Sequence, residues 1–207
     1  MSKRPFLPCG EPSGGWVSPL KKTVMPAEQK RPDVVEARRT WHRRVARTKP
    51  GRLIVLDETA FTTNMHTASG YAPRGERLTV YEPHGHRNTT TFVGALTPEG
   101  MIAPLVIDGP MNSLVFESYI NNTLAKEVRP GDLLIMDNLS AHKTAAVQEA
   151  LNRSGIKYLY LPPYSPDFSP IENAFSKVKR RMRQLAERTF SGLWSALGAV
   201  LQSLSAS

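Results

Sequence analysis

Cysteine is almost absent from this 207-residue chain, because Cys9 is the only one. A single cysteine excludes a disulfide framework and a cysteine-based zinc site. Long apolar runs are also missing, since none approaches the roughly 20 residues needed to span a bilayer. The segment 1–22 lacks the apolar core of a secretory signal, and the chain has no glycine-rich phosphate loop. These absences favour a cytoplasmic protein without membrane contact.

Acidic residues are outnumbered, since 18 acids against 27 lysines and arginines leave a formal charge of +9. The sequence pI is about 9.9. A basic balance of this size points to a polyanionic partner such as nucleic acid, although basic surfaces also serve solubility. The hydrophobic fraction of 40% and the charged fraction of 22% are typical of a globular protein.

The distribution of proline and glycine divides the chain into three parts. Residues 1–26 are rich in both, which predicts a disordered or loosely attached segment. Residues 27–50 predict a basic helical linker whose helix begins at Pro32, with proline at its first position. Residues 51–207 alternate short apolar runs with helical patterns and form the predicted folded domain.

Arginine dominates one side of the predicted linker helix. The residues are Arg38, Arg39, Arg43, Arg44 and Arg47. Two interpretations stay open: a solvated face, or a face that lies along DNA. Arginines this dense repel one another unless a counter-charge is present, and DNA phosphates would supply one.

Patterning within 51–207 predicts an α/β domain. Strands are expected at about 52–57, 89–96, 101–107, 133–136 and 156–161, and helices at about 113–127, 140–153, 170–185 and 191–204. The turn at 97–100 should join the second and third strands as a hairpin. Leu114, Tyr119 or Ile120, and Leu124 are the expected inward residues of the first of these helices. The alternation predicts a mixed sheet with helices on its faces.

Three acids stand at the ends of these elements. Asp57 closes the apolar run 53–56, Asp137 closes the run 133–136, and Glu172 opens a basic helix. Acids at strand ends lie at the rim of a sheet, where oxygen ligands for a hard cation can converge. Two such ions about 3.5–4 Å apart can activate an attacking oxygen and stabilise a leaving one. The pattern favours metal-dependent phosphodiester chemistry.

Each acid also has a structural interpretation. An aspartate after an apolar run is often a turn or cap residue. Ser169 and Glu172 fit a capping box at the start of a helix. Clustered like charges cost stability when no metal is bound, so the three acids together favour function over structure. Asp108, at the end of the third strand, is the best substitute if one assignment is wrong.

The helix after Glu172 predicts two stripes at about 100° per residue. The apolar stripe, expected on the sheet, is Ile171, Phe175, Val178, Met182 and Leu185. Glu172, Lys179 and Arg183 form the second stripe, so a metal ligand could be followed by two phosphate-binding cations. The alternative is an amphipathic surface helix with solubilising charges.

Several other polar residues stand out. His142 lies one turn after the second acid, where it could orient water, touch phosphate or bind a backbone group. Glu58 follows the first acid, but its side chain should point to the opposite face of the strand. His84 and His86 have same-face strand spacing, yet they lack the further ligands of a zinc site. Arg87 beside them is a candidate DNA contact.

The motifs around the three acids resemble a known family. They read Leu-Asp-Glu-Thr at 56–59, Met-Asp-Asn-Leu-Ser-Ala-His-Lys at 136–143, and Leu-Pro-Pro-Tyr-Ser-Pro-Asp-Phe-Ser-Pro-Ile-Glu-Asn at 161–173. The chain resembles the DDE transposases of the mariner superfamily, in the branch carried by bacterial insertion sequences. The 34 residues between Asp137 and Glu172 are the spacing expected of that branch. The resemblance runs from about 21 to 197.

The resemblance implies a ribonuclease-H-like fold, a mixed sheet with flanking helices. It implies a catalytic triad of Asp57, Asp137 and Glu172 that holds two Mg²⁺ ions, or Mn²⁺ in their place. Water would first attack a phosphodiester at a transposon end, and the freed 3′-hydroxyl would then attack target DNA at a TA dinucleotide. The predicted DNA contacts are Lys179, Arg183, Arg38, Arg39, Arg43, Arg44, Arg87 and His142. The expected partner is double-stranded DNA, bound by a homodimer at the bacterial nucleoid.

Two departures from the family matter. Its members normally carry helix-turn-helix modules ahead of the catalytic domain, and segment 1–20 does not resemble them. Residues 201–207 stand in place of the expected closing segment, so 51–207 is expected to be truncated at its C-terminus. A separately encoded helix-turn-helix partner would supply what is missing. The alternatives are a nuclease of the same fold and a non-catalytic DNA-binding remnant that regulates the full-length transposase.

Overall fold

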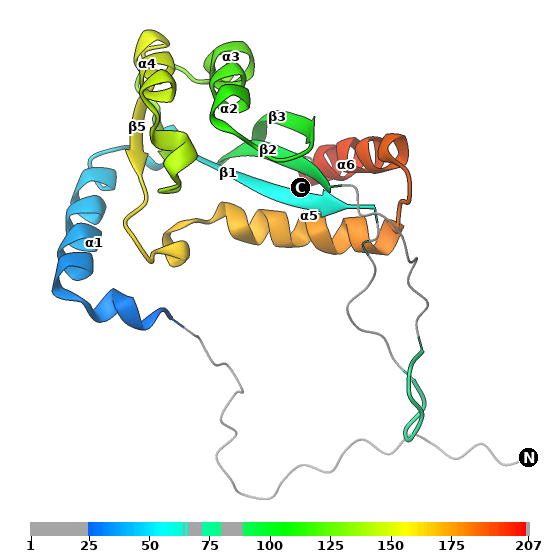
Figure 1. Cartoon of the computed structure of the whole chain (residues 1–207). Coiled ribbons are helices and arrows are strands. Elements are labelled where there is room, and N and C mark those ends of the chain that lie inside the picture. The colour runs from blue at the N-terminus through cyan, green and yellow to red at the C-terminus, as the bar shows by residue number, and fades with distance from the viewer. Residues whose placement is uncertain (1–24, 64, 66–71, 80–88, 206–207) are drawn as a thin grey trace, which may run out of the picture.

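The computed structural model describes residues 25–63, 65, 72–79 and 89–205. It contains one five-stranded sheet with helices on both faces (Figure 1). The strands are β1 (Leu53–Thr62), β2 (Thr89–Thr97), β3 (Gly100–Asp108), β4 (Leu133–Met136) and β5 (Lys157–Tyr160). The helices are α1 (Pro32–Val45), α2 (Ser113–Tyr119), α3 (Ala125–Glu127), α4 (Ala145–Arg153), α5 (Ile171–Leu185) and α6 (Phe190–Ser205). All but the last two positions of the predicted loose segment 1–26 lie outside the described residues.

The sheet is mixed, with the strand order β3-β2-β1-β4-β5. β1 and β2 run antiparallel, as do β2 and β3, and Thr97 pairs with Gly100 across the predicted hairpin turn. β4 runs parallel to both β1 and β5. The predicted α/β architecture with a mixed sheet is therefore confirmed, and β1 is longer than expected because it continues beside β2 as far as Thr62.

Both faces of the central strands are buried. Ile54 and Leu56 of β1 pack in one core with α2 and α4, whereas Val55 packs in the other with α5 and α6. Figure 1 shows α2, α3 and α4 on one side of the sheet and α5 on the other. Burial on two faces explains why the strands read as continuous apolar runs rather than as alternating patterns. Among the described helices, none has the length and apolarity to cross a membrane.

Two helical predictions needed correction. Leu114 of α2 is 74% exposed rather than inward. The predicted inward residues Tyr119, Ile120 and Leu124 are buried, as is Phe116, and the turn Ile120–Leu124 is π-helical. The helix predicted at 140–153 begins only at Ala145, after a 3₁₀ turn at Ser140–Lys143.

The central strands β1 and β4 diverge toward their carboxyl ends. Their backbone pairing stops at Val55 and Ile135. Beyond this point β1 remains paired with β2, while Met136 of β4 pairs with Tyr160 of β5. The carboxyl ends of parallel strands that part in this way form the crevice where open α/β sheets bind ligands.

Candidate active site

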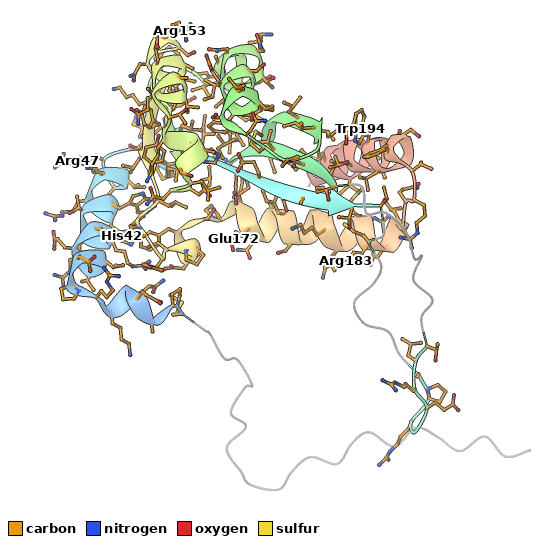
Figure 2. The ribbon with its side chains drawn as sticks, viewed as in Figure 1. His42, Arg47, Arg153, Glu172, Arg183 and Trp194 are labelled. Atoms are coloured by element: carbon orange, nitrogen blue, oxygen red, sulfur yellow. The ribbon has the colours of Figure 1, made fainter. Side chains whose placement is uncertain are left out.

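A cavity of about 300 Å³ lies where β1 and β4 diverge, and the three predicted acids line it. Asp57 comes from β1, Asp137 follows β4, and Glu172 lies in the first turn of α5, labelled in Figure 2. The loop 161–169 forms the remaining wall. The structure thus brings all three acids to one place, although two of them are 115 residues apart in the chain.

The electrostatics of Asp57 reflect this crowding. Burial, together with the negative charges of Glu58, Asp137 and Glu172, raises the pKa of Asp57 to about 6. The backbone N–H of Glu58 donates to Asp57 Oδ1 over 2.8 Å and opposes the rise. A carboxyl group that ionises against three other acids sits where a cation would be favourable.

The donor set suits a hard divalent cation, since Asp57, Asp137 and Glu172 offer only carboxylate oxygens. Within the described residues, however, no three His, Cys, Asp or Glu side chains lie close enough together to hold an ion. The cavity therefore provides the ligand type and the negative charge but not a preformed cage.

Glu172 has no capping partner. α5 begins at Ile171 with Pro170 at the N-cap, and no side chain caps it. The predicted capping box is therefore wrong, because Pro170 takes the position that Ser169 would need. Glu172 stays exposed at the cavity.

His142 is buried, with 2% of its surface exposed. Its Nδ1 lies 2.7 Å from Asp137 Oδ1, and its Nε2 lies 2.8 Å from Glu58 Oε1. Burial alone would lower the pKa of His142, but the hydrogen bonds to Asp137 and Glu58 and their charges raise it to about 9. The ring thus meets two carboxylates rather than a backbone group, and the phosphate contact stays a prediction.

The second stripe of α5 continues away from the cavity. Lys179 is half-buried, and burial lowers its pKa together with the charge of Arg183, while the charge of Asp57 opposes the shift. Lys179 is thus within electrostatic reach of Asp57. Arg183 lies farther along α5 (Figure 2). Four of the five predicted inward residues of this helix are buried, whereas Leu185 is 40% exposed.

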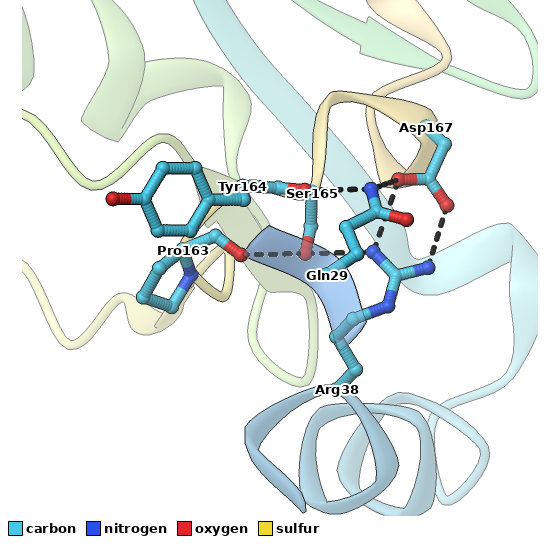
Figure 3. Close-up of polar contacts among 6 residues, drawn as sticks. All are labelled: Gln29, Arg38, Pro163, Tyr164, Ser165 and Asp167. Carbon is cyan, nitrogen blue, oxygen red and sulfur yellow. Dashed lines mark hydrogen bonds and ion pairs between the residues drawn. The ribbon is translucent and has the colours of Figure 1, made fainter. Parts of the chain in front are cut away.

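Arg38 of α1 is engaged inside the fold (Figure 3). Its guanidinium binds both carboxylate oxygens of Asp167, at 3.0 and 2.7 Å, and donates to Ser165 Oγ over 2.8 Å. It also lies 3.9 Å from the ring centroid of Phe168. The structure gives Arg38 a task different from the predicted DNA contact: it fastens α1 to the loop that walls the cavity.

The other predicted DNA contacts vary in their surroundings. Arg39 and Arg43 are exposed beside Glu36, at 4.0 and 2.8 Å. Arg44 is exposed at a groove between α1 and β5. Arg87 lies outside the described residues, as do His84 and His86.

The partners of two residues were not predicted from the sequence. Glu58 was expected on the face opposite Asp57, but its bond to His142 was not expected. Asp167 was part of a quoted motif only, although Gln29 and Arg38 both bind it. An acid beside a candidate metal ligand and an aspartate in a stiff proline-rich loop are the signals that could have drawn attention to them.

The strand order, the flanking helices and the acids at the divergence define an α/β protein of the ribonuclease-H-like class. A family model described as DDE superfamily endonuclease matches residues 52–192, and the chain belongs to this family. A comparison with curated proteins found no match.

Solved transposase structures share the fold. The Mos1 transposase paired-end complex with the left transposon end has a TM-score of 0.70 at 16% identity, covering 93% of this chain and 59% of its own. The Mos1 paired-end complex with Mn has a TM-score of 0.64 at 16% identity, covering 81% and 53%. The Mos1 catalytic domain with Raltegravir and Mg has a TM-score of 0.58 at 15% identity, covering 81% and 80%. The chain thus spans about 59% of the first Mos1 chain.

Proposed function

We propose that this chain is the catalytic domain of a DNA transposase that cleaves DNA and transfers the cut strand in a metal-dependent reaction. One observation carries the proposal: Asp57, Asp137 and Glu172 reach a single cavity from β1, from the end of β4 and from α5. Membership of the DDE superfamily endonucleases and the fold shared with Mos1 transposase support it. The motif spacing supports the insertion-sequence branch of the mariner superfamily.

The three acids are the proposed metal ligands. Asp57, Asp137 and Glu172 would together hold two divalent ions, Mg²⁺ or Mn²⁺, through their carboxylate oxygens. When bound, the ions activate the attacking oxygen and stabilise the leaving oxygen of a phosphodiester. Mos1 structures with Mn and with Mg are among the similar ones, which supports this metal choice.

Cations on α5 and α1 are the proposed DNA contacts. Lys179 and Arg183 follow Glu172 along α5 and bind phosphates without reading sequence. Arg39, Arg43 and Arg44, exposed on α1, are further proposed phosphate contacts. The proposed partner is double-stranded DNA, both transposon end and target, bound by a homodimer with a separately encoded helix-turn-helix protein in the bacterial cytoplasm.

Calorimetric titration of Mn²⁺ into the whole chain tests the site. Wild type should bind, whereas Asp57→Asn and Asp137→Asn should abolish binding, because each removes a charged oxygen ligand while keeping the side-chain shape. Glu99→Gln is the matched control, since Glu99 is an exposed acid in the turn between β2 and β3 and should leave binding unchanged.

Identical weak binding in all four proteins would contradict the metal site. Salt-sensitive DNA binding that is indifferent to Mn²⁺ and to Asp57→Asn would then favour a non-catalytic DNA-binding protein. If Mn²⁺ does bind, a plasmid assay separates the remaining possibilities. Joined DNA products support the transposase, and cut products without joining favour a nuclease of the same fold.

A further inference from the structure

Backbone hydrogen bonds do not fix the separation of Asp57 and Asp137. The last pair between their strands is Val55 with Ile135, and both aspartates lie two residues beyond it. From there each strand follows a different neighbour. Something other than sheet pairing must hold the two carboxylates at a defined distance.

The side chain of His142 crosses this gap. One ring nitrogen meets Asp137 Oδ1 at 2.7 Å and the other meets Glu58 Oε1 at 2.8 Å. Glu58 is the chain neighbour of Asp57 on β1, and its backbone N–H also binds Asp57 Oδ1. The Glu58–His142–Asp137 bridge therefore connects the diverging ends of β1 and β4.

His142, at the centre of the bridge, is held in place. The imidazole stacks on Phe116 with ring centroids 4.1 Å apart and planes inclined by 26°. Tyr160 donates its hydroxyl to the carbonyl oxygen of His142 over 2.8 Å. Stacking on Phe116 restrains the ring, and the hydrogen bond from Tyr160 restrains the backbone that carries it.

The bridge also distinguishes the two oxygens of Asp137. Oδ1 accepts from the His142 ring and from the backbone N–H of Leu139 at 3.2 Å. No hydrogen bond from the described residues reaches Oδ2. One oxygen is thus used to orient the carboxylate, and the other is left for a ligand in the cavity.

We propose that Glu58 and His142 are positioning residues, which set the separation of Asp57 and Asp137 and orient Asp137 Oδ2 for a divalent cation. This inference rests on the proposed function. Groups that orient metal ligands by hydrogen bonding commonly change metal affinity by about 10–100-fold when replaced. His142 and Glu58 themselves need not touch the ion.

The rival explanation is that His142 is only a packed core residue. Any replacement would then act through lost stability, as Leu151→Ala in the same core would. Leu151 is buried in α4 and is absent from the bridge, so Leu151→Ala serves as a control that lowers Tm without touching a carboxylate.

The test measures Mn²⁺ affinity by calorimetry and Tm on the whole chain. His142→Leu should weaken Mn²⁺ binding by about 10–100-fold. His142→Asn should fall between wild type and His142→Leu, because the amide N–H can still donate to Asp137 but cannot reach Glu58. Glu58→Gln should bind like wild type, because its carbonyl oxygen still accepts from His142, whereas Glu58→Leu should weaken binding.

The double variant of His142→Leu and Glu58→Leu should bind no more weakly than the weaker single variant, because the bridge acts as one unit. Affinity in His142→Leu and Glu58→Leu equal to that of Leu151→Ala would overturn the inference. If His142→Leu does not fold, His142→Asn and Glu58→Leu decide. Weaker Mn²⁺ binding in these two variants than in Leu151→Ala supports the inference, and equal binding overturns it. Loss of binding in Asp57→Asn but not in these variants refutes only the inference, and absence of binding in wild type refutes the proposed function with it.

Discussion

Two walls of the cavity are held by the same kind of contact in different surroundings. In the first, which we call the sheet wall, His142 binds the carboxylates of Glu58 and Asp137 and stacks on Phe116. In the second, which we call the loop wall, Arg38 binds the carboxylate of Asp167 and lies over Phe168. In each wall, therefore, an imidazole or guanidinium group binds carboxylate oxygens and contacts an aromatic ring.

Solvent exposure separates the two walls. The side chain of His142 is 2% exposed, against 18% for Arg38. The partner carboxylates differ less, since Glu58 is 11%, Asp137 32% and Asp167 29% exposed. Buried polar contacts lack water as an alternative partner, so breaking one leaves uncompensated groups. Partly exposed ion pairs are screened and contribute less. The sheet wall should therefore fix the geometry of the site, whereas the loop wall should be adjustable.

The largest expected effect is a loss of unfolding free energy when the aromatic ring of each wall, Phe116 or Phe168, is removed. Phe116 is fully buried, so Phe116→Ala should cost about 3–5 kcal/mol of unfolding free energy. Phe168 is only half-buried, so Phe168→Ala should cost about 1–2 kcal/mol, since a smaller cavity remains. Urea unfolding of the two variants measures the difference. Equal losses would remove the distinction between the walls.

Alkaline pH should weaken the sheet wall. The folded-state pKa of His142 is about 9, above its ordinary value of 6.5, because its two carboxylate partners outweigh burial. The bridge therefore contributes fully below pH 6.5 and is lost as pH rises through 9. The contribution should be on the order of 1–3 kcal/mol. The stability difference between wild type and His142→Asn should shrink across this range, and a constant difference would contradict the assignment.

A conservative change should weaken the loop wall only slightly. Arg38→Lys keeps the charge but removes the fork that binds both oxygens of Asp167, which should cost about 1 kcal/mol. Mn²⁺ affinity should stay unchanged, in contrast to His142→Leu. The reverse result, a stable protein with weakened Mn²⁺ binding, would mean that the loop wall also sets the metal site.

Local sequence patterns were enough to predict most of the framework. Short contiguous segments predict the hairpin at 97–100 and the strands that lead to Asp57 and Asp137. The structure contains all of these elements. The convergence of the acids on one cavity was predictable once the two strands were taken as neighbours.

The contacts that hold the walls could not be predicted in the same way. Glu58 and His142 are 84 residues apart, and Arg38 and Asp167 are 129 apart, so no local pattern records either pair. The predicted N-cap of α5 was wrong for another reason. Ser169 satisfies the capping pattern, but Pro170 occupies the N-cap position. Helix ends and side-chain partners depend on tertiary packing, which overrides local preference.

The smallest expected effect is an acid-dependent loss of the loop wall. The hydrogen bond from Arg38 holds the pKa of Asp167 below its ordinary value of 3.8. The contribution is therefore present above pH 3.8 and is lost as pH falls below it, because Asp167 must then be protonated. A partly exposed pair of this kind is worth about 0.2–1 kcal/mol. The Tm of wild type should exceed that of Asp167→Asn at pH 7, and the two should converge toward pH 3; a gap that persists in acid would show that Asp167 acts through packing rather than through its charge.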